Sequence, residues 1–211
     1  NQDMLSYNEE EQTYKLGLKL VRMAHSAWLQ SSLAPVAVPF IDELSAKVGE
    51  TVHLAELDNG QVLYVDKRNP ASPIEMYSQA GKVGPAYCTG VGKAMMAFLE
   101  ESELSKVISK QVFFKYTDHT ITSEKALRKE LTMIKKEGIS FDRQEHEEKI
   151  ICISSPILTS NGRVIGGLSI TSSTDIHSLE SLEKYKPELL ATSEQIGKEA
   201  GAWSFPEKSI N

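Results

Sequence analysis

"TVHLAELDNGQVLYVDK", residues 51–67, is the stretch where the hydrophobic pattern of the chain changes from helical spacing to alternation. Val52 and Leu54 alternate with their neighbours, and the Asp-Asn-Gly sequence at 58–60 is typical of a tight turn. β-Branched and aromatic residues resume directly after this turn. Two such runs joined by a short turn predict a β-hairpin.

The segment before this hairpin has helical periodicity. Residues 14–29 carry apolar side chains three or four positions apart, which predicts an amphipathic helix with an apolar side formed by Leu16, Leu20, Met23, Ala24 and Ala27. A second helix is predicted to begin at Pro35 and to end at Gly49, because glycine tolerates the left-handed conformation of a helix C-cap.

The segment after the hairpin continues with one more strand, then helices, three strands and a final helix. In chain order we predict a strand at 73–81, helices beginning at Gly90, Ser102 and Ser123, strands at 139–144, 150–158 and 164–173, and a helix over 178–203 that is interrupted at Pro187. Thr89 and Ser123 are candidate N-caps, and Gly138 is a candidate C-cap. Strands joined mostly by hairpins form an antiparallel sheet, so we expect an α+β fold.

The composition limits the classes of protein. With 211 residues, 40% hydrophobic and 25% charged, the chain matches one globular domain with some additional helix. Its apolar runs are shorter than the roughly 18 residues of a membrane span, and its acidic first residues do not match a signal peptide. The chain opens on Asn1 rather than Met, so we expect a piece of a longer protein.

Charge and cysteine usage indicate the environment. A net charge of −6 repels phosphate backbones, so we expect no DNA binding by these residues alone. Cys88 and Cys152 lie far apart and form no CxxC pair, which favours a reducing, cytoplasmic location.

"PAYCTGVGKAMMAFL", residues 85–99, places a Gly-x-Gly-Lys loop before an apolar helix. Ala94 stands where a phosphate-binding P-loop has a hydroxyl, and Met95 stands where a dinucleotide-binding motif has its third glycine. Backbone N–H groups at a helix start remain, and they suit a carboxylate. The alternative is a helix start without a ligand. We expect Lys93 to point along the helix, so that it need not touch such a ligand.

Two further segments carry polar groups. Acidic residues surround His146 within 141–157, but a solvated loop explains them better than a metal site does. Neither cysteine has a histidine at a spacing that indicates a nucleophile. Ser169 and Thr171 point to the same face of their strand and need partners there, either from the backbone or from a polar ligand.

The chain resembles the IclR family of bacterial transcription regulators in the segments "YKLGLKL", "GETVHLAELDNGQVLYVDK", "GPAYCTGVGKAMMAFL", "ITSEKALRKELTMIKKEGISFDRQEHEEKIICISSPI" and "GRVIGGLSI". The resemblance implies a winged helix-turn-helix, a linker helix and a GAF-like effector-binding domain. It assigns residues 1–30 to a wing remnant and the linker helix, 31–205 to the GAF-like domain and 206–211 to a tail. Operator DNA would then contact an N-terminal domain that is missing from this chain.

The same resemblance implies the residues of an effector site. The backbone at Gly90 and Val91 would face the carboxylate of a small organic acid. The other lining residues would be Met76, Asp142, Ile150, Cys152, Ser169 and Thr171. Lys149 stands where the family often has glycine, and Thr171 replaces a common serine, so the identity of the acid does not transfer.

We therefore expect the effector domain of a transcription regulator and not an enzyme, without cofactor or metal. The effector would be a sugar acid or keto acid that controls a catabolic operon, and the protein would be a homodimer or homotetramer. Exposed apolar residues such as Leu20 and Trp28 on the linker helix favour self-association. The alternatives are an enzyme that uses Asp142 and Cys152 on a carboxylate, and an interaction module with a filled core.

Overall fold

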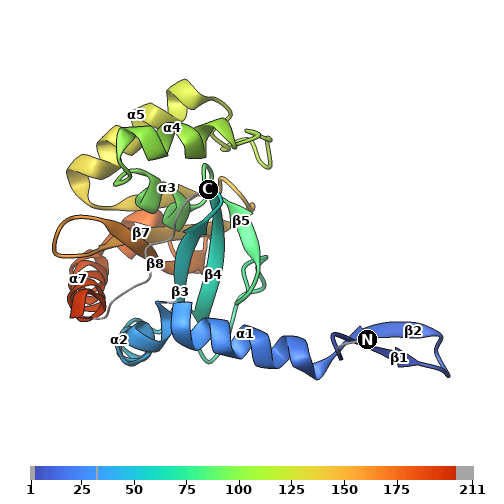
Figure 1. Ribbon diagram of the computed structural model, residues 1–211. Helices are drawn as coiled ribbons and strands as arrows, with labels where there is room; N and C mark the ends of the chain where they lie inside the picture. The colour runs from blue at the N-terminus through green and yellow to red at the C-terminus, as the bar shows by residue number, and fades with distance from the viewer. Residues whose placement is uncertain (1–2, 32, 203–211) are drawn as a thin grey trace.

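The computed structural model describes residues 3–31 and 33–202, which include a six-stranded antiparallel sheet with helices on both faces (Figure 1). The strands lie in the order β5-β4-β3-β8-β7-β6. Their bounds are Thr51–Asp58 (β3), Gln61–Arg68 (β4), Val83–Pro85 (β5), Ser140–Arg143 (β6), Ile150–Leu158 (β7) and Val164–Ser173 (β8). This architecture confirms the predicted α+β fold.

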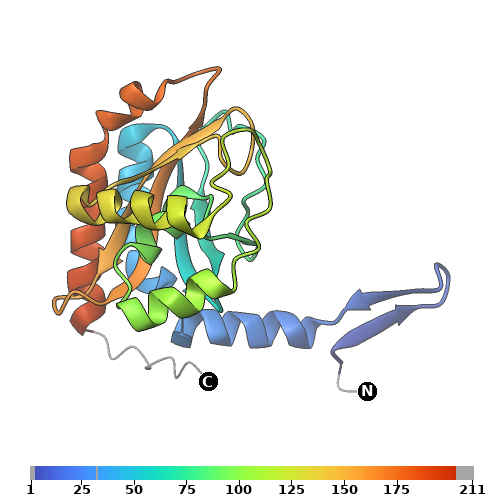
Figure 2. The same cartoon turned by 90° about the horizontal axis from the view of Figure 1, so that it is seen from above.

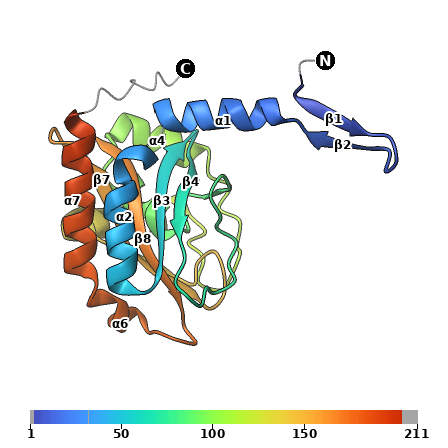
Figure 3. The same cartoon turned by 90° about the horizontal axis from the view of Figure 1, so that it is seen from below.

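Helices form a layer on each face of the sheet. Helices α2 (Ala34–Val48) and α7 (Lys186–Ala202) run side by side across one face (Figure 3). Helices α3 (Gly90–Met96), α4 (Glu101–Ser109) and α5 (Glu124–Glu137) lie on the opposite side, at the top of Figure 1. Each layer buries its own apolar core, and the site described below lies under α3.

Local capping signals explain the helices that the sequence predicts well. In α2, Pro35 lies in the first turn, and Gly49 ends the helix with a φ of 69° while its N–H donates to Ser45 O at 3.0 Å. In α5, Ser123 Oγ accepts from Ala126 N at 3.3 Å, and Gly138 ends the helix with a φ of 72°. These bounds confirm both predictions.

The strand predicted at 73–81 is wrong. This segment is irregular, and β5 instead begins at Val83. The pairing with β4 includes Gly81 N–H to Tyr64 O (2.8 Å) and Tyr64 N–H to Lys82 O (3.0 Å). Within 73–81, the backbone N–H of Tyr77 donates to the Glu147 carboxylate, and the Ser78 hydroxyl contacts His53. Tertiary contacts therefore outweigh the local strand pattern, and 73–81 becomes a wall of the site.

The N-terminal helix predicted over 14–29 begins too early. Residues Thr13–Leu16 form β2, which pairs with β1 (Leu5–Asn8), and helix α1 spans Leu18–Ser31. Gly17 separates the two elements, because its N–H donates to Met4 O at 2.8 Å and a Cβ there would overlap Asp3 O. The hairpin and α1 project from the body (Figure 2).

Other boundaries also shift. Helix α4 begins at Glu101, before the predicted Ser102, and α3 ends at Met96. The predicted C-terminal helix is two helices, α6 (Leu179–Glu183) and α7, with Pro187 in the first turn of α7, and its predicted last residue lies outside the described residues. Across the described chain, no helix combines the length and apolar character needed to cross a membrane.

Candidate functional site

A small polar cavity lies between the sheet and the first turn of α3, with a volume of about 30 Å³. It brings together seven of the residues that the resemblance implies: Gly90, Val91, Asp142, Ile150, Cys152, Ser169 and Thr171. Met76 is buried but lies outside this lining. The remaining lining residues, which the sequence pattern did not identify, are His53, Tyr64, Ser78, Thr89, His146 and Glu147.

The register of the sheet aligns these side chains. His53 on β3 lies opposite Ser169 on β8, and Thr171 on β8 lies opposite Cys152 on β7, which in turn pairs with Asp142 on β6. Neighbouring strands are about 4.8 Å apart, so His53 and Asp142 are separated by about 14 Å of sheet. The polar groups therefore extend across four strands rather than cluster at one point.

Gly90 allows α3 to approach the sheet closely. A Cβ at this position would overlap Cys152 Sγ and Ser154 Oγ on β7. Gly90 does not have a positive φ, so close packing and not an unusual backbone conformation requires glycine here. Val91 follows in the first turn, where backbone N–H groups have no helical carbonyl partner. This turn is the part of α3 that lines the cavity.

A neutral histidine organises one end of the cavity. His53 is buried, and its Nδ1 lies 3.3 Å from both Ser169 Oγ and Thr171 Oγ1, while its Nε2 lies 2.8 Å from Ser78 Oγ. Burial, with Lys67 nearby, lowers the pKa of His53 to about 3, so the imidazole is neutral at physiological pH. Ser169 Oγ and Thr171 Oγ1 also lie 3.4 Å apart, so the two hydroxyls and the imidazole form one hydrogen-bonded group.

Asp142 lies at the other end of the cavity. Its carboxyl is buried, and Oδ1 accepts from Glu145 N at 2.8 Å. Burial and the neighbouring Glu145 carboxylate raise the pKa of Asp142 to about 7. The side chain is therefore divided between its acid and its carboxylate form near neutral pH.

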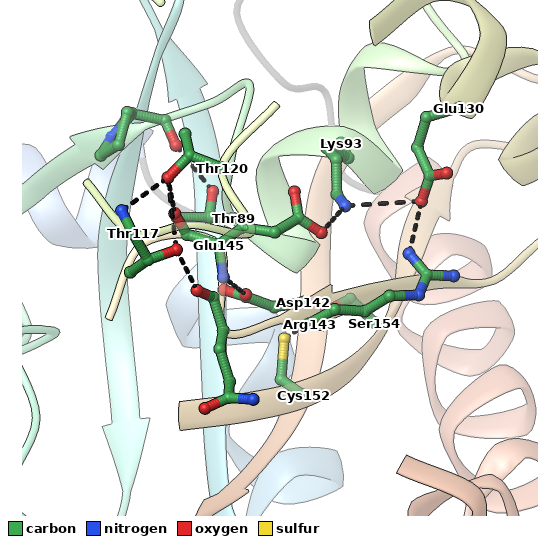
Figure 4. Close-up of polar contacts among 12 residues, drawn as sticks. Thr89, Lys93, Thr117, Thr120, Glu130, Asp142, Arg143, Glu145, Cys152 and Ser154 are labelled. Atoms are coloured by element: carbon green, nitrogen blue, oxygen red, sulfur yellow. Dashed lines mark hydrogen bonds and ion pairs between the residues drawn. The ribbon is translucent and has the colours of Figure 1, made fainter. Parts of the chain in front are cut away.

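Lys93 is fully buried and lies outside the lining of the cavity. Its ammonium forms an ion pair with Glu145 and lies 3.4 Å from Glu130 Oε1, which also accepts from Arg143 at 2.8 Å (Figure 4). Burial raises the pKa of Glu145 although Lys93 opposes the shift. The lysine therefore neutralises a buried acid and is not free to bind a ligand.

Threonines hold the segment that carries Glu145. Thr117 Oγ1 donates to Gln144 O and Thr120 Oγ1 donates to Glu145 O, each at 2.6 Å (Figure 4). Both threonines are buried. The backbone after β6 is thus fixed beside the cavity by side chains from the loop before α5.

Aromatic rings surround His146 at the edge of the cavity. Its ring meets Tyr77 edge-on at 5.5 Å and Tyr116 at 4.7 Å between centroids. The adjacent Glu147 carboxylate accepts from Tyr77 N at 2.9 and 3.0 Å. Within the described ranges, no group of three or more His, Cys, Asp or Glu side chains is placed to hold a metal ion.

The cysteines are poorly suited to nucleophilic chemistry. Burial and Asp142 raise the pKa of Cys152 to about 12, and burial raises the pKa of Cys88 still further. Both are thiols at neutral pH, whereas the nucleophile is the thiolate. Cys152 Sγ lies 3.3 Å from Ser154 Oγ and contributes to the wall.

Comparisons with known proteins agree with this fold. Residues 25–198 match the family model described as "Bacterial transcriptional regulator IclR C-terminal". The chain is 32% identical to the transcriptional regulator KdgR of Escherichia coli over 93% of its own length and 75% of the relative. The C-terminal domain of E. coli KdgR superimposes with a TM-score of 0.71 at 31% identity, covering 80% of this chain and 98% of that structure. The IclR structure of Thermotoga maritima superimposes with a TM-score of 0.83 at 28% identity, covering 95% of this chain and 81% of that structure.

Proposed function

Since the chain belongs to the IclR family of bacterial transcription regulators, we propose that it binds a small organic acid through the cavity under α3 and thereby controls a catabolic operon. The observation that carries the proposal is that the backbone of α3 and buried polar side chains of β3, β6 and β8 line one cavity. Its relatives are regulators, and the thiols are protonated, so we propose a sensor and not an enzyme.

The lining favours an acid that also carries hydroxyl or keto oxygens. Backbone N–H groups at Gly90 and Val91 suit a carboxylate, and the hydroxyls of Ser169 and Thr171 beside neutral His53 suit uncharged oxygens. A sugar acid or a keto acid has both. We assign Met76, which is buried within segment 73–81, to an apolar wall that an enlarged cavity would reach, and Ile150 and Cys152 to the wall on β7.

Binding requires the cavity to enlarge. About 30 Å³ holds about two water molecules, which is less than an organic acid needs. β3 links the cavity to the helices, because His53 lines it and Glu56 Oε1 on the same strand accepts from Leu33 N, at the start of α2, at 2.8 Å. We propose that the acid shifts β3 and segment 73–81, and that α1 transmits the shift to an N-terminal DNA-binding domain that contacts the operator.

The test is binding without turnover. Pyruvate and D-gluconate, as probes of the two acid classes, are expected to raise the apparent stability of the protein by about 2.7 kcal/mol at a hundredfold excess over Kd. NMR of the same samples should show both acids unchanged. Ser169→Ala should weaken binding of the better probe about tenfold by removing a hydroxyl donor. Isothermal titration calorimetry measures both affinities.

The matched control is Ser155→Ala. Ser155 lies on the opposite face of the sheet, where its hydroxyl contacts Ser193 Oγ at 2.6 Å, so probe affinity should not change. An equal loss of probe affinity in both variants would contradict the proposal and indicate general destabilisation. Consumption of a probe would contradict it in favour of the enzyme alternative.

Self-association is a further part of the proposal. Leu20 and Trp28 are half-buried rather than exposed, and Trp28 packs on the core beneath α2. The exposed apolar face of α1 is formed instead by Leu18, 80% exposed, and Val21, 62% exposed. We propose that this face forms a homodimer, or a homotetramer with a second interface, and that residues 1–30 are the wing remnant and linker helix of a cytoplasmic protein.

A double substitution on α1 tests this assignment. Leu18→Glu/Val21→Glu should convert the dimer into a monomer at tens of micromolar in light scattering, because like charges would face each other across the interface. Met23→Glu/Ala27→Glu, at exposed positions on the opposite side of α1, is the control for adding two charges. Dimers that survive the first change, or dissociate only with the control, would place the interface elsewhere.

A further inference from the structure

The surroundings of Asp142 contain more acids than bases. Its carboxyl on β6 faces the cavity between α3 and the segment 144–149. The titratable groups that act on it from the neighbouring elements are Tyr64, Cys88, Lys93, Glu145, Glu147 and Cys152. Burial keeps the phenol and both thiols protonated and uncharged near neutral pH. The charge balance of the cavity therefore depends on the acids, on Lys93, and on Lys67 and Lys82, which act on the lining residues His53 and Glu147.

Lys93 offsets the charge of Asp142 only in part, because it lowers the pKa of that carboxyl less than burial and Glu145 raise it. Its ammonium contacts Glu145 and Glu130, and Asp142 forms no ion pair within the part of the chain that the structure describes. The polar contact of Asp142 is the backbone N–H of Glu145 at 2.8 Å. A second carboxylate entering this cavity would thus place two anions together in a buried site, where the ammonium of Lys93 is already paired with Glu145 and Glu130 and that of Lys67 donates to Ser78 O at 2.8 Å.

We propose that the organic acid binds together with one proton, which Asp142 holds. The Asp142 hydroxyl then donates to the bound acid while backbone N–H groups contact the acid's carboxylate. This inference rests on the proposed function and adds that the affinity for the organic acid depends on pH. Two carboxylates that share a buried site do not both ionise, because their repulsion is screened poorly there.

Because the pKa of Asp142 is about 7, both its acid and its carboxylate form are populated near neutral pH, which supports a link between proton uptake and binding of the organic acid. A group that must be protonated for binding makes affinity rise as the pH falls through its pKa and level off below it. His53, with a pKa of about 3, stays neutral throughout this window. Glu145 and Glu147 have raised pKa values and His146 a lowered one, so a variant is needed to assign the proton.

Isothermal titration calorimetry with pyruvate and D-gluconate at pH 6 and pH 8 tests the proposal. The better probe should bind about tenfold more tightly at pH 6 than at pH 8. At pH 8, the difference between the binding enthalpies in phosphate and in Tris should correspond to uptake of close to one proton. Asp142→Asn imitates the protonated form and keeps an acceptor for Glu145 N–H. It should retain the pH 6 affinity at both pH values and take up no proton. Asp58→Asn, at the exposed β3–β4 turn, should behave as the wild type.

The outcomes separate the two proposals. No binding of either probe at either pH would contradict the proposed function and this inference with it. Binding with equal affinity at both pH values and no proton uptake by the wild type would contradict the inference alone. Proton uptake that persists in Asp142→Asn would assign the proton to Glu145, Glu147 or His146 and would also overturn it.

Discussion

Replacing Lys93 by Met is expected to lower the free energy of unfolding by about 3–5 kcal/mol, the range for removing one partner of a buried ion pair. Lys93 is fully buried, and its ammonium neutralises Glu145, whose carboxylate is also buried. The lysine's removal leaves that carboxylate without a cation beside Asp142. Glu145 Oε2 already lacks a hydrogen-bond partner within the described residues, so its desolvation has little other compensation.

Urea denaturation at pH 7.5 measures this loss. Lys149→Met is the matched control, because the Lys149–Asp175 pair has side chains that are 66% and 65% exposed, and such pairs contribute about 0–1 kcal/mol. The double variant Lys93→Met/Glu145→Gln should recover part of the loss, since it removes the unpaired charge. A loss no larger than that of Lys149→Met would show that the pair does not stabilise the fold.

The loss of stability caused by Lys93→Met should also depend on pH. Without the lysine, the pKa of Glu145 in the folded protein rises further above its unfolded value, so the native state binds more protons than the unfolded state. The free energy of unfolding of the variant should therefore recover relative to the wild type as the pH falls from 8 towards about 5. A deficit that is constant over this range would assign it to packing alone.

Gly90→Ala is expected to destabilise the protein by about 1–3 kcal/mol and to abolish stabilisation by pyruvate or D-gluconate. The added Cβ would overlap Cys152 Sγ and Ser154 Oγ, and both side chains are buried in the sheet surface. The first turn of α3 must then move away from β7. That movement displaces the backbone N–H of Val91 from the cavity.

Gly201→Ala in α7 is the control for adding a methyl group. A Cβ there meets no atom within 4 Å, and alanine favours a helix, so its stability should rise slightly or stay unchanged in urea denaturation. Cys152→Ala combined with Gly90→Ala should show a favourable coupling of about 0.5 kcal/mol or more, because it removes one overlapping atom. Equal behaviour of the Gly90 and Gly201 variants would contradict the packing argument.

Helix ends and hairpins were accessible to prediction because their causes are local. Gly49 and Gly138 have the left-handed conformation that ends α2 and α5, and Ser123 caps α5 through a neighbour three residues away. The turn at 58–60 joins β3 and β4, which pair from Asp58 and Gln61 next to the turn, with one register shift between Leu54 and Ala55. Each signal depends on a few adjacent residues, so tertiary contacts did not overrule it.

Predictions failed where a distant partner outweighed the local pattern. Residues 14–16 have helical periodicity, but Leu16 pairs with Leu5 and Tyr14 with Tyr7, whose rings lie 4.9 Å apart. Segment 73–81 has the composition of a strand, but Tyr77 donates to Glu147, 70 residues away. Hydrogen bonds of this kind depend on the packed sheet, which no window of sequence describes.

The candidate site likewise has features that the sequence predicts and features that depend on tertiary packing. Family motifs at Gly90, Asp142 and Ser169 identified parts of the lining, because their spacing is readable along the chain. The electrostatics emerged only from packing. Lys93 meets Glu145 across 52 residues and His53 meets Ser169 across 116. Their charge states depend on burial, and burial exists only after α3 has packed onto the sheet, which removes these groups from water.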